Sequence, residues 1–385
     1  MESSDEYLVD ELTKHQLKYN VYSLVGLINL LGQALRNTSD DTAAERTTLF
    51  PIKDVEGFTF YKKQEAAIWN NSEMEFSRDK DDYDAFQPEL KRVIDKIFSY
   101  FSFADGRVIE NILFRLMLMC NTIEQRMFYG VQLFIEQVHS EFYSKTIDTV
   151  IPDPEKRQRL YKALDEMPIM QKKDKWMTAY MQADLGPAYI ILPYICVEGI
   201  AFQASFTFIL WFKTIGKMDN VVFGNIQVRK DEALHRNFGI YKFGQLTESQ
   251  KPPIEHVLRI IQEAVDLELE FTDNVIPKTI EYRADPKSEF PDAILNPKDI
   301  KQYIRLTADH LLVSLGYESH WKVDPGTFPA WLHEIAMDTK NNFYEVRGGN
   351  YTQFSLKNIY LGRPKATSTF IFDDSTYNNP DDVDF

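Results

Sequence analysis

Cysteine is scarce in this chain of 385 residues, and its scarcity limits what the protein can be. The two cysteines, Cys120 and Cys196, lie inside apolar segments with helical spacing. Two such residues provide no disulfide framework of the kind that small secreted domains use. We therefore expect two reduced core thiols and a cytoplasmic protein.

Signals for strands, phosphate binding and secretion are missing as well. The sequence has no long alternation of apolar and polar residues and no glycine-rich phosphate loop, and we expect no signal peptide. The formal net charge of −15 disfavours nucleic acid and anionic membranes as partners. We expect no contact with either.

Helical periodicity dominates the chain instead. The segments with this pattern are residues 5–36, 60–70, 83–102, 108–146, 154–165, 168–183, 187–215, 219–245, 250–276 and 297–315. These segments predict an all-α fold in which one large bundle forms a common core.

Two Glu-x-x-His tetrads are the strongest positive signal. Glu136 precedes His139 by three residues, and Glu232 precedes His235 by three, each inside a helical segment. Residues i and i+3 share one face of a helix, so each tetrad presents a carboxylate and an imidazole to the same point. Bundles that hold two iron or manganese ions combine two such tetrads with a carboxylate from each of two other helices. The tetrads therefore predict a dinuclear metal site with two further buried acids.

Glu198 is the first of these acids. It is the only charge in the apolar run 188–212, which is long enough to cross a bilayer. A membrane span is the alternative, but there is no second run of this length, and helices in a bundle core can be apolar all round. An ionised carboxylate buried there needs a partner or a metal, so we interpret Glu198 as a ligand. Pro193 is expected to kink this helix.

Asp105 is the second acid. It is the first charge after the aromatic run 98–103 and precedes the segment that carries Glu136. From the residues alone it fits equally well as the N-cap of that helix.

Four strings in the chain resemble the small, radical-generating subunit of class I ribonucleotide reductase, closest to its eukaryotic and viral forms. They are FSFADG (101–106), MFYGVQLFIEQVHSEFYSKTID (127–148), VEGIAFQASF (197–206) and VRKDEALHRNF (228–238). The similarity extends from about Leu49 to Tyr351. It implies a ferritin-like helical bundle with additional helices that forms a homodimer. It also implies two sets of metal ligands, namely Asp105, Glu136 and His139 for one ion and Glu198, Glu232 and His235 for the other.

The ligand chemistry suits iron or manganese better than zinc. Four carboxylates offset the charge of two divalent ions, and with two imidazoles they form a hard, oxygen-rich site. The expected cofactor is two iron ions per chain, with manganese plus iron as the open alternative.

Tyr143 lies four residues after His139, on the same helical face and within reach of the metals. From the residues alone it can also be a core tyrosine bonded to a carboxylate. The resemblance implies that it is oxidised to a stable tyrosyl radical when the reduced metals react with oxygen. Phe202 and Phe206 are then expected to pack around its ring.

The resemblance also implies a route for the radical. Asp231 would accept a hydrogen bond from the second ring nitrogen of His139, and Trp69 would bond to Asp231. Read alone, Trp69 is a core aromatic residue and Asp231 a solvated helix acid. Tyr351 matches the tail tyrosine that passes the radical to the large subunit, with Glu345 upstream. Tyr360 and Tyr377 are the rivals of Tyr351 for this role.

The expected organisation has three parts. Residues 1–48 form an N-terminal helical extension of unknown role, and residues 49–340 form the ferritin-like, radical-generating domain. Residues 341–385 form a flexible acidic tail. The tail is either a frayed terminus or the segment that docks on the large subunit.

The resemblance implies the small subunit of ribonucleoside-diphosphate reductase, which supplies a radical to a large subunit that reduces ribonucleotides to deoxyribonucleotides. Two alternatives remain. A stand-alone ferritin-like di-metal oxidase would need a substrate channel and would have no use for Trp69 and Asp231 as a relay. A ferritin-like iron-binding protein without radical chemistry would leave Tyr143 incidental.

Overall fold

A computed structural model describes residues 48–336, apart from residues 73, 163–166, 184 and 284–291. The expected extension 1–48 lies outside the described residues except for its last position. The expected tail 341–385 lies outside them entirely.

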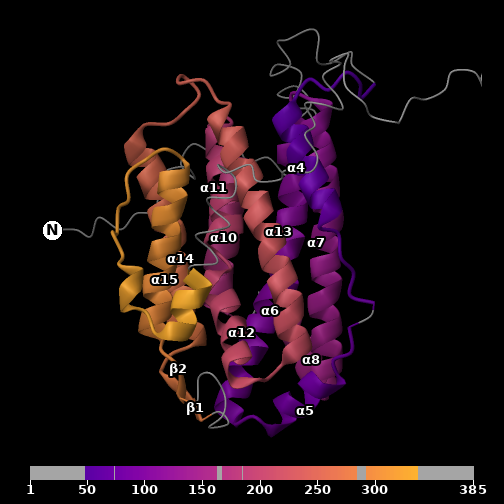
Figure 1. Ribbon diagram of the computed structural model, residues 1–385, viewed down its shortest axis with the longest axis vertical. Coiled ribbons are helices and arrows are strands. Elements are labelled where there is room, and N and C mark those ends of the chain that lie inside the picture. Colours follow the sequence, from indigo (N-terminus) through magenta and orange to yellow (C-terminus); the bar gives the residue numbers. More distant parts are fainter. Residues whose placement is uncertain (1–47, 73, 163–166, 184, 284–291, 337–385) are drawn as a thin grey trace, which may run out of the picture. The chain divides into compact units, whose positions relative to one another are not determined.

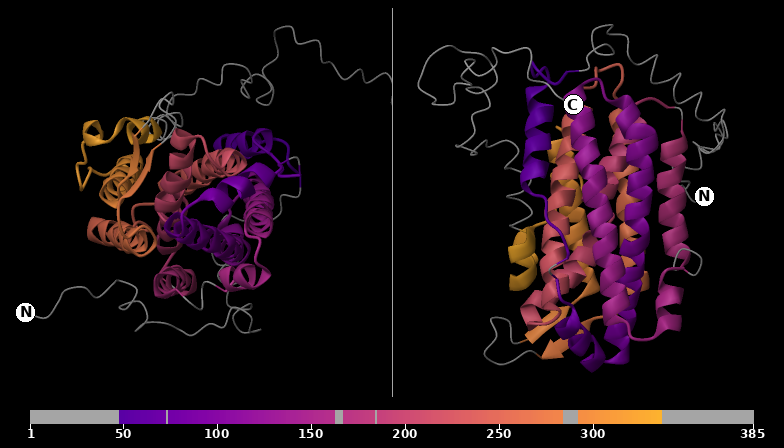
Figure 2. Two further views of the ribbon diagram at one scale, coloured as in Figure 1. Left: turned by 90° about the horizontal axis from the view of Figure 1, so that it is seen from below. Right: turned by 90° about the vertical axis from the view of Figure 1, so that its right-hand side faces the viewer.

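Helices make up most of the described chain. In chain order they are α4 (Val55–Ala66), α5 (Ser77–Ala85), α6 (Pro88–Asn111), α7 (Ile123–Val150), α8 (Pro154–Leu160), α10 (Pro168–Gln182), α11 (Ala188–Gly199), α12 (Gln203–Ile215), α13 (Asp219–Gly244), α14 (Ile254–Val275) and α15 (Pro297–Ser314). The long helices run side by side, and an end-on view shows that their axes share one general direction (Figure 1 and Figure 2). The expected all-α bundle is confirmed.

Side chains fix the starts of the two helices that carry the tetrads. The Thr122 hydroxyl accepts a hydrogen bond from the backbone N–H of Gln125 at 3.3 Å and caps α7. At the start of α13, the buried carboxylate of Asp79 on α5 accepts from the backbone N–H groups of Asn220 and Val221, both at 3.0 Å. The register of α13 is therefore held from a distant helix.

The helix that carries the first tetrad was expected to start at residue 108, and this prediction is wrong. Helix α6 continues through Asp105 and is followed by a π-helical turn (Ile112–Leu116) and a 3-10 turn (Met117–Met119), so α7 begins only at Ile123. Asp105 is therefore an interior residue of α6 and not an N-cap. Gly106 does not end the helix, because apolar side chains on both sides of it are buried and tertiary packing overrides its weak helix propensity.

The apolar segment 188–215 is a core element. It is long and apolar enough to cross a membrane, but 94% of its most apolar window is buried inside the protein. The segment is also broken, because α11 ends at Gly199 and α12 starts at Gln203. The break follows Glu198, whereas Pro193 lies inside α11.

A buried ion pair satisfies the backbone groups at this break. The carbonyl oxygen of Ala201 accepts from the Tyr100 hydroxyl at 2.8 Å and from Lys173 Nζ at 2.9 Å. The backbone N–H of Ala204 donates to Glu268 Oε1 at 2.8 Å, and Glu268 pairs with Lys173. Removing one partner of a buried ion pair typically costs about 3–5 kcal/mol. The ion pair of Lys173 and Glu268 therefore fixes the backbone of residues 201–204, which follow the predicted ligand Glu198.

A short hairpin is the one sheet in the described part of the chain, and the sequence did not predict it. Strand β1 (Ile280–Arg283) pairs antiparallel with β2 (Asp292–Leu295), and Ile280 lies opposite Leu295. The hairpin lies at one end of the bundle, where β2 contacts α12 (Figure 1). Strands of four residues are too short to give a clear alternating pattern.

The helices that carry the predicted ligands pack directly on one another. Helix α7 contacts α6 and α13, and α13 contacts α11. The approach of α13 to α7 is close at Gly224, where an added Cβ would lie 2.2 Å from the ring of Phe142. This packing brings four chain segments that are far apart in sequence to one region of the core.

Candidate metal centre

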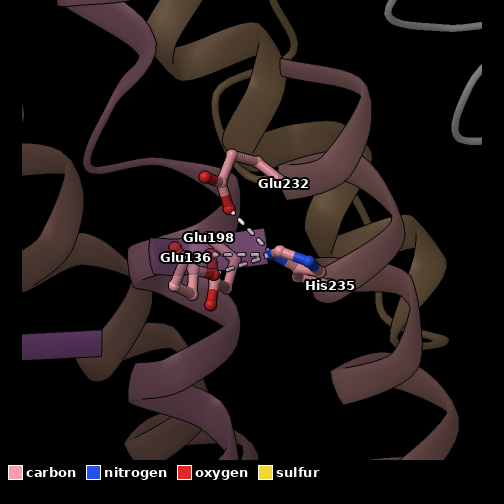
Figure 3. A group of neighbouring side chains, drawn as sticks. All are labelled: Glu136, Glu198, Glu232 and His235. Carbon is pink, nitrogen blue, oxygen red and sulfur yellow. Dashed lines mark hydrogen bonds and ion pairs between the residues drawn. The ribbon is translucent and has the colours of Figure 1, made fainter. Parts of the chain in front are cut away.

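All six predicted ligands are buried. Asp105 comes from α6, Glu198 from α11, and the two tetrads from α7 and α13. None of the six residues is more than 3% exposed. Glu136, Glu198 and Glu232 point toward the ring of His235 (Figure 3), and one ligand atom from each of these four residues lies within 4.8 Å of the others.

Two glutamates lie between the two imidazoles. Glu136 places Oε1 at 3.0 Å from Nδ1 of His235 and Oε2 at 3.4 Å from Nδ1 of His139. Glu232 places Oε2 at 3.1 Å from Nδ1 of His235 and Oε1 at 3.2 Å from Nδ1 of His139. The arrangement offers two positions for a cation, one beside each imidazole, with Glu136 and Glu232 available to both.

The other two acids flank this pair. Glu198 Oε2 lies 3.9 Å from Nδ1 of His235. Burial, followed by the charges of Glu232 and Glu136, raises the pKa of Glu198 well above its usual range. Burial and the charge of Glu136 do the same to the pKa of Asp105. In both cases burial is the main cause, and the neighbouring glutamates further disfavour the charged forms of Asp105 and Glu198.

The donor set fits two metal ions. Asp105 Oδ2 and Glu198 Oε2 are buried oxygens with no hydrogen-bond partner among the described residues. Such atoms are rare in folded proteins unless an ion or water binds them. Four carboxylates and two imidazoles without a thiolate suit iron or manganese, and two divalent cations would balance the four negative charges.

Asp231 connects the site to Trp69. Its Oδ2 accepts from the indole Nε1 of Trp69 at 2.8 Å and lies 3.1 Å from Nε2 of His139. Its Oδ1 accepts from the amide of Gln64 on α4 at 2.8 Å. The structure therefore brings Trp69, Asp231 and His139 together. A proton on Nε2 of His139 leaves Nδ1 free to bind a metal.

Gln132 is a site residue that sequence analysis missed. Its amide donates to Glu136 Oε1 at 3.2 Å and to Glu198 Oε1 at 3.0 Å. The Tyr194 hydroxyl donates to Gln132 Oε1 at 2.8 Å and fixes the orientation of the amide. Gln132 lies one turn before Glu136 on the same helical face, so its spacing could have indicated it.

Tyr143 is fully buried, and its hydroxyl donates to Oδ1 of Asn225 at 2.9 Å. The partner is an amide and not a carboxylate. The ring of Phe101 stacks on Tyr143 with a centroid distance of 4.2 Å and an angle of 2°. Phe202 and Phe206 pack against Phe101, at 5.9 and 5.3 Å. Phe101 and Asn225 are therefore neighbours of Tyr143 that the sequence did not indicate.

Burial, followed by the charge of Asp105, raises the pKa of the Tyr143 phenol well above its usual value. The predicted tail residues Glu345, Tyr351, Tyr360 and Tyr377 lie outside the described residues.

Comparison with known proteins adds a family match. The model of the family "Ribonucleotide reductase, small chain" matches residues 46–329. A ribonucleoside-diphosphate reductase small chain of Arabidopsis thaliana is 34% identical over 313 residues, which is 81% of this chain and 87% of the relative. Ribonucleoside-diphosphate reductase subunit M2 of Homo sapiens is 33% identical over 315 residues, which is 81% of this chain and 76% of the relative.

Solved structures share the fold. Dimanganese(II)-NrdF of Streptococcus sanguinis superposes with a TM-score of 0.65 at 18% identity, covering 76% of this chain and 99% of that protein. The ribonucleotide reductase Rnr4 homodimer of Saccharomyces cerevisiae gives a TM-score of 0.63 at 21% identity, covering 83% and 100%.

We expect the iron-loaded protein to bind about two metal ions per chain, as this ligand pattern does in other bundles. Glu136→Ala and Glu232→Ala should each lose most of the metal, because each glutamate lies beside both imidazoles. Glu141→Ala, which removes an exposed carboxylate from the same helix α7, is the control and should keep it. Elemental analysis of the three variants checks the assignment, and a full metal content in either of the first two would contradict it.

Proposed function

Because the chain belongs to the family of ribonucleotide reductase small chains, we propose that it generates a tyrosyl radical on Tyr143 and supplies it to a separate large subunit. The observation that carries this proposal is the position of Tyr143. The residue follows the ligand His139 by one helical turn, is fully buried, and is stacked against Phe101. A phenol in such a place is protected from water and from reductants in solution.

The six buried residues would hold the metals, and the expected pair is two iron ions, with manganese plus iron as the alternative. Iron bound there would supply electrons for the reduction of dioxygen and so provide the oxidant for Tyr143.

The chain itself controls geometry and protonation. Gln132 holds one oxygen each of Glu136 and Glu198. Asp231 holds the ring of His139 so that Nδ1 faces the carboxylates. A phenol is already protonated at neutral pH, and burial raises the pKa of Tyr143 further, so its hydroxyl keeps the proton until an electron is removed.

Trp69 is the residue through which the radical would leave the site. Its ring lies 6.0 Å from that of His139, and its indole is bonded to Asp231. Trp69 is half-buried, and its neighbours Ile68 and Asn70 are exposed. Trp69 is therefore connected to the predicted ligand His139 through Asp231 and is itself partly exposed. We propose that the radical passes from there to Tyr351 of the tail, and that the tail docks on the large subunit.

We also propose that two chains form a homodimer.

One observation disfavours the alternatives. A ferritin-like iron-binding protein or a stand-alone oxidase has no use for Trp69 and Asp231 as a radical relay, whereas the structure joins Trp69 to His139 through Asp231.

Tyr143→Phe should bind metal normally and lack the tyrosyl signal, since the variant removes only the phenolic oxygen. The measurement is low-temperature electron paramagnetic resonance after anaerobic loading with iron and exposure to oxygen. Tyr129→Phe is the matched control, because it changes another fully buried tyrosine of α7, and its signal should persist. An unchanged signal in Tyr143→Phe would exclude Tyr143 as the radical site.

Tyr351→Phe should bind the large subunit normally and lose turnover, because phenylalanine keeps the shape of the side chain but cannot be oxidised in its place. Removal of residues 373–385 should instead weaken association and leave the Tyr143 radical intact. Association and turnover are measured on the same samples. An active Tyr351→Phe enzyme would transfer the relay role to Tyr360 or Tyr377.

A further inference from the structure

The Tyr143 phenol is hydrogen-bonded to a neutral side chain whose orientation is fixed. Asn225 is fully buried on α13, and its Oδ1 accepts from the Tyr143 hydroxyl at 2.9 Å. Its Nδ2 donates to the backbone carbonyl of Val221, one turn earlier, at 2.8 Å. The two ends of the amide therefore have different partners, and its oxygen faces the phenol.

The neighbouring glycine explains how Asn225 comes so close. At Gly224, an added Cβ would lie 2.2 Å from the ring of Phe142, the residue that precedes Tyr143. Only a residue without a side chain lets α13 approach α7 at this distance. The next residue along α13 then reaches the phenol with a short side chain.

The contact favours one redox state of Tyr143. The phenol donates a hydrogen bond, and the amide oxygen accepts it. The phenoxyl radical has no proton to donate, so its oxygen would face another acceptor. If the amide turned so that Nδ2 faced the radical, its hydrogen bond to the Val221 carbonyl would break. Oδ1 would then face that carbonyl oxygen, and neither oxygen could donate. Asn225 therefore stabilises the reduced form and offers no donor to the radical.

We propose that Asn225 is a positioning residue that makes Tyr143 harder to oxidise and leaves its radical without a hydrogen-bond donor. The inference deepens the proposed function and rests on it. Oxidation removes one electron and one proton from the phenol. An amide oxygen is too weak a base to keep the proton, so the proton leaves with the electron. Dioxygen would accept both, because its reduction to water takes four electrons, of which the two irons would supply two, Tyr143 one and an external one-electron reductant the fourth.

Two isosteric variants test the proposal. Asn225→Leu removes the acceptor without adding a donor. Asn225→Asp replaces the amide with a carboxylate of the same shape, which can take the phenolic proton and return it as a hydrogen bond to the radical. Each protein is loaded with iron, exposed to oxygen, exchanged into deuterated water, and examined by high-field electron paramagnetic resonance and electron–nuclear double resonance.

The wild-type and Leu radicals should show no exchangeable deuteron coupled to the phenoxyl oxygen, whereas the Asp radical should show one. Asn225→Leu removes one neutral hydrogen bond from the reduced phenol. In this variant the equilibrium between Tyr143 and a one-electron mediator should therefore shift about fivefold toward the radical. Metal content, measured on the same samples, should not change. An exchangeable coupling in the wild type, or identical spectra in all three proteins, would overturn the proposal.

A measurement on the metal-free protein separates this inference from the proposed function. With ¹³Cζ-labelled tyrosine, the resonance that disappears in Tyr143→Phe should shift in Asn225→Leu. If the resonance shifts but no loaded protein forms a radical, the proposed function fails while the contact stands. If radicals form and the resonance does not shift, the role of Asn225 is wrong.

Discussion

The burial of four carboxylates in one apolar core is the constraint on which the rest of the structure depends. Asp105, Glu136, Glu198 and Glu232 are each at most 3% exposed, and charges desolvated in this way are stable only when they are paired or bound to metal. Two neutral imidazoles do not balance them. Two divalent cations would balance them, and the surrounding helices bring the six predicted ligands together in the core.

The residues around the ligands follow from the same charge balance. Gln64, Gln132 and Asn225 orient Asp231, the ligand carboxylates and Tyr143 through neutral amides. Amides can orient a charged or redox-active group without adding a charge that the metals would have to offset. Asp231 is the exception, and it shares its two oxygens among three donors. The three amides thus hold the side chains of the site in place without changing the net charge of the site.

The sequence predicted the parts of the site that depend on local spacing. The two tetrads and Glu198 were found because a charge at a fixed helical interval, or alone in an apolar run, leaves a local pattern. Asp105 was predicted as a further buried acid and is buried, but its position inside α6 was not predicted, because packing overrides the weak propensity of Gly106. Asn225 could not be found, since its role comes from the close approach of α13 to α7 and no local pattern records that contact.

The positions of the metal ions test the account most directly. Anomalous diffraction at the iron edge from crystals of the loaded protein measures them. The account predicts two peaks separated by roughly 3.5–4 Å, as in other two-metal sites. One peak should lie beside His139 and the other beside His235, with Glu136 and Glu232 between them. A single peak, or two peaks away from these residues, would contradict it.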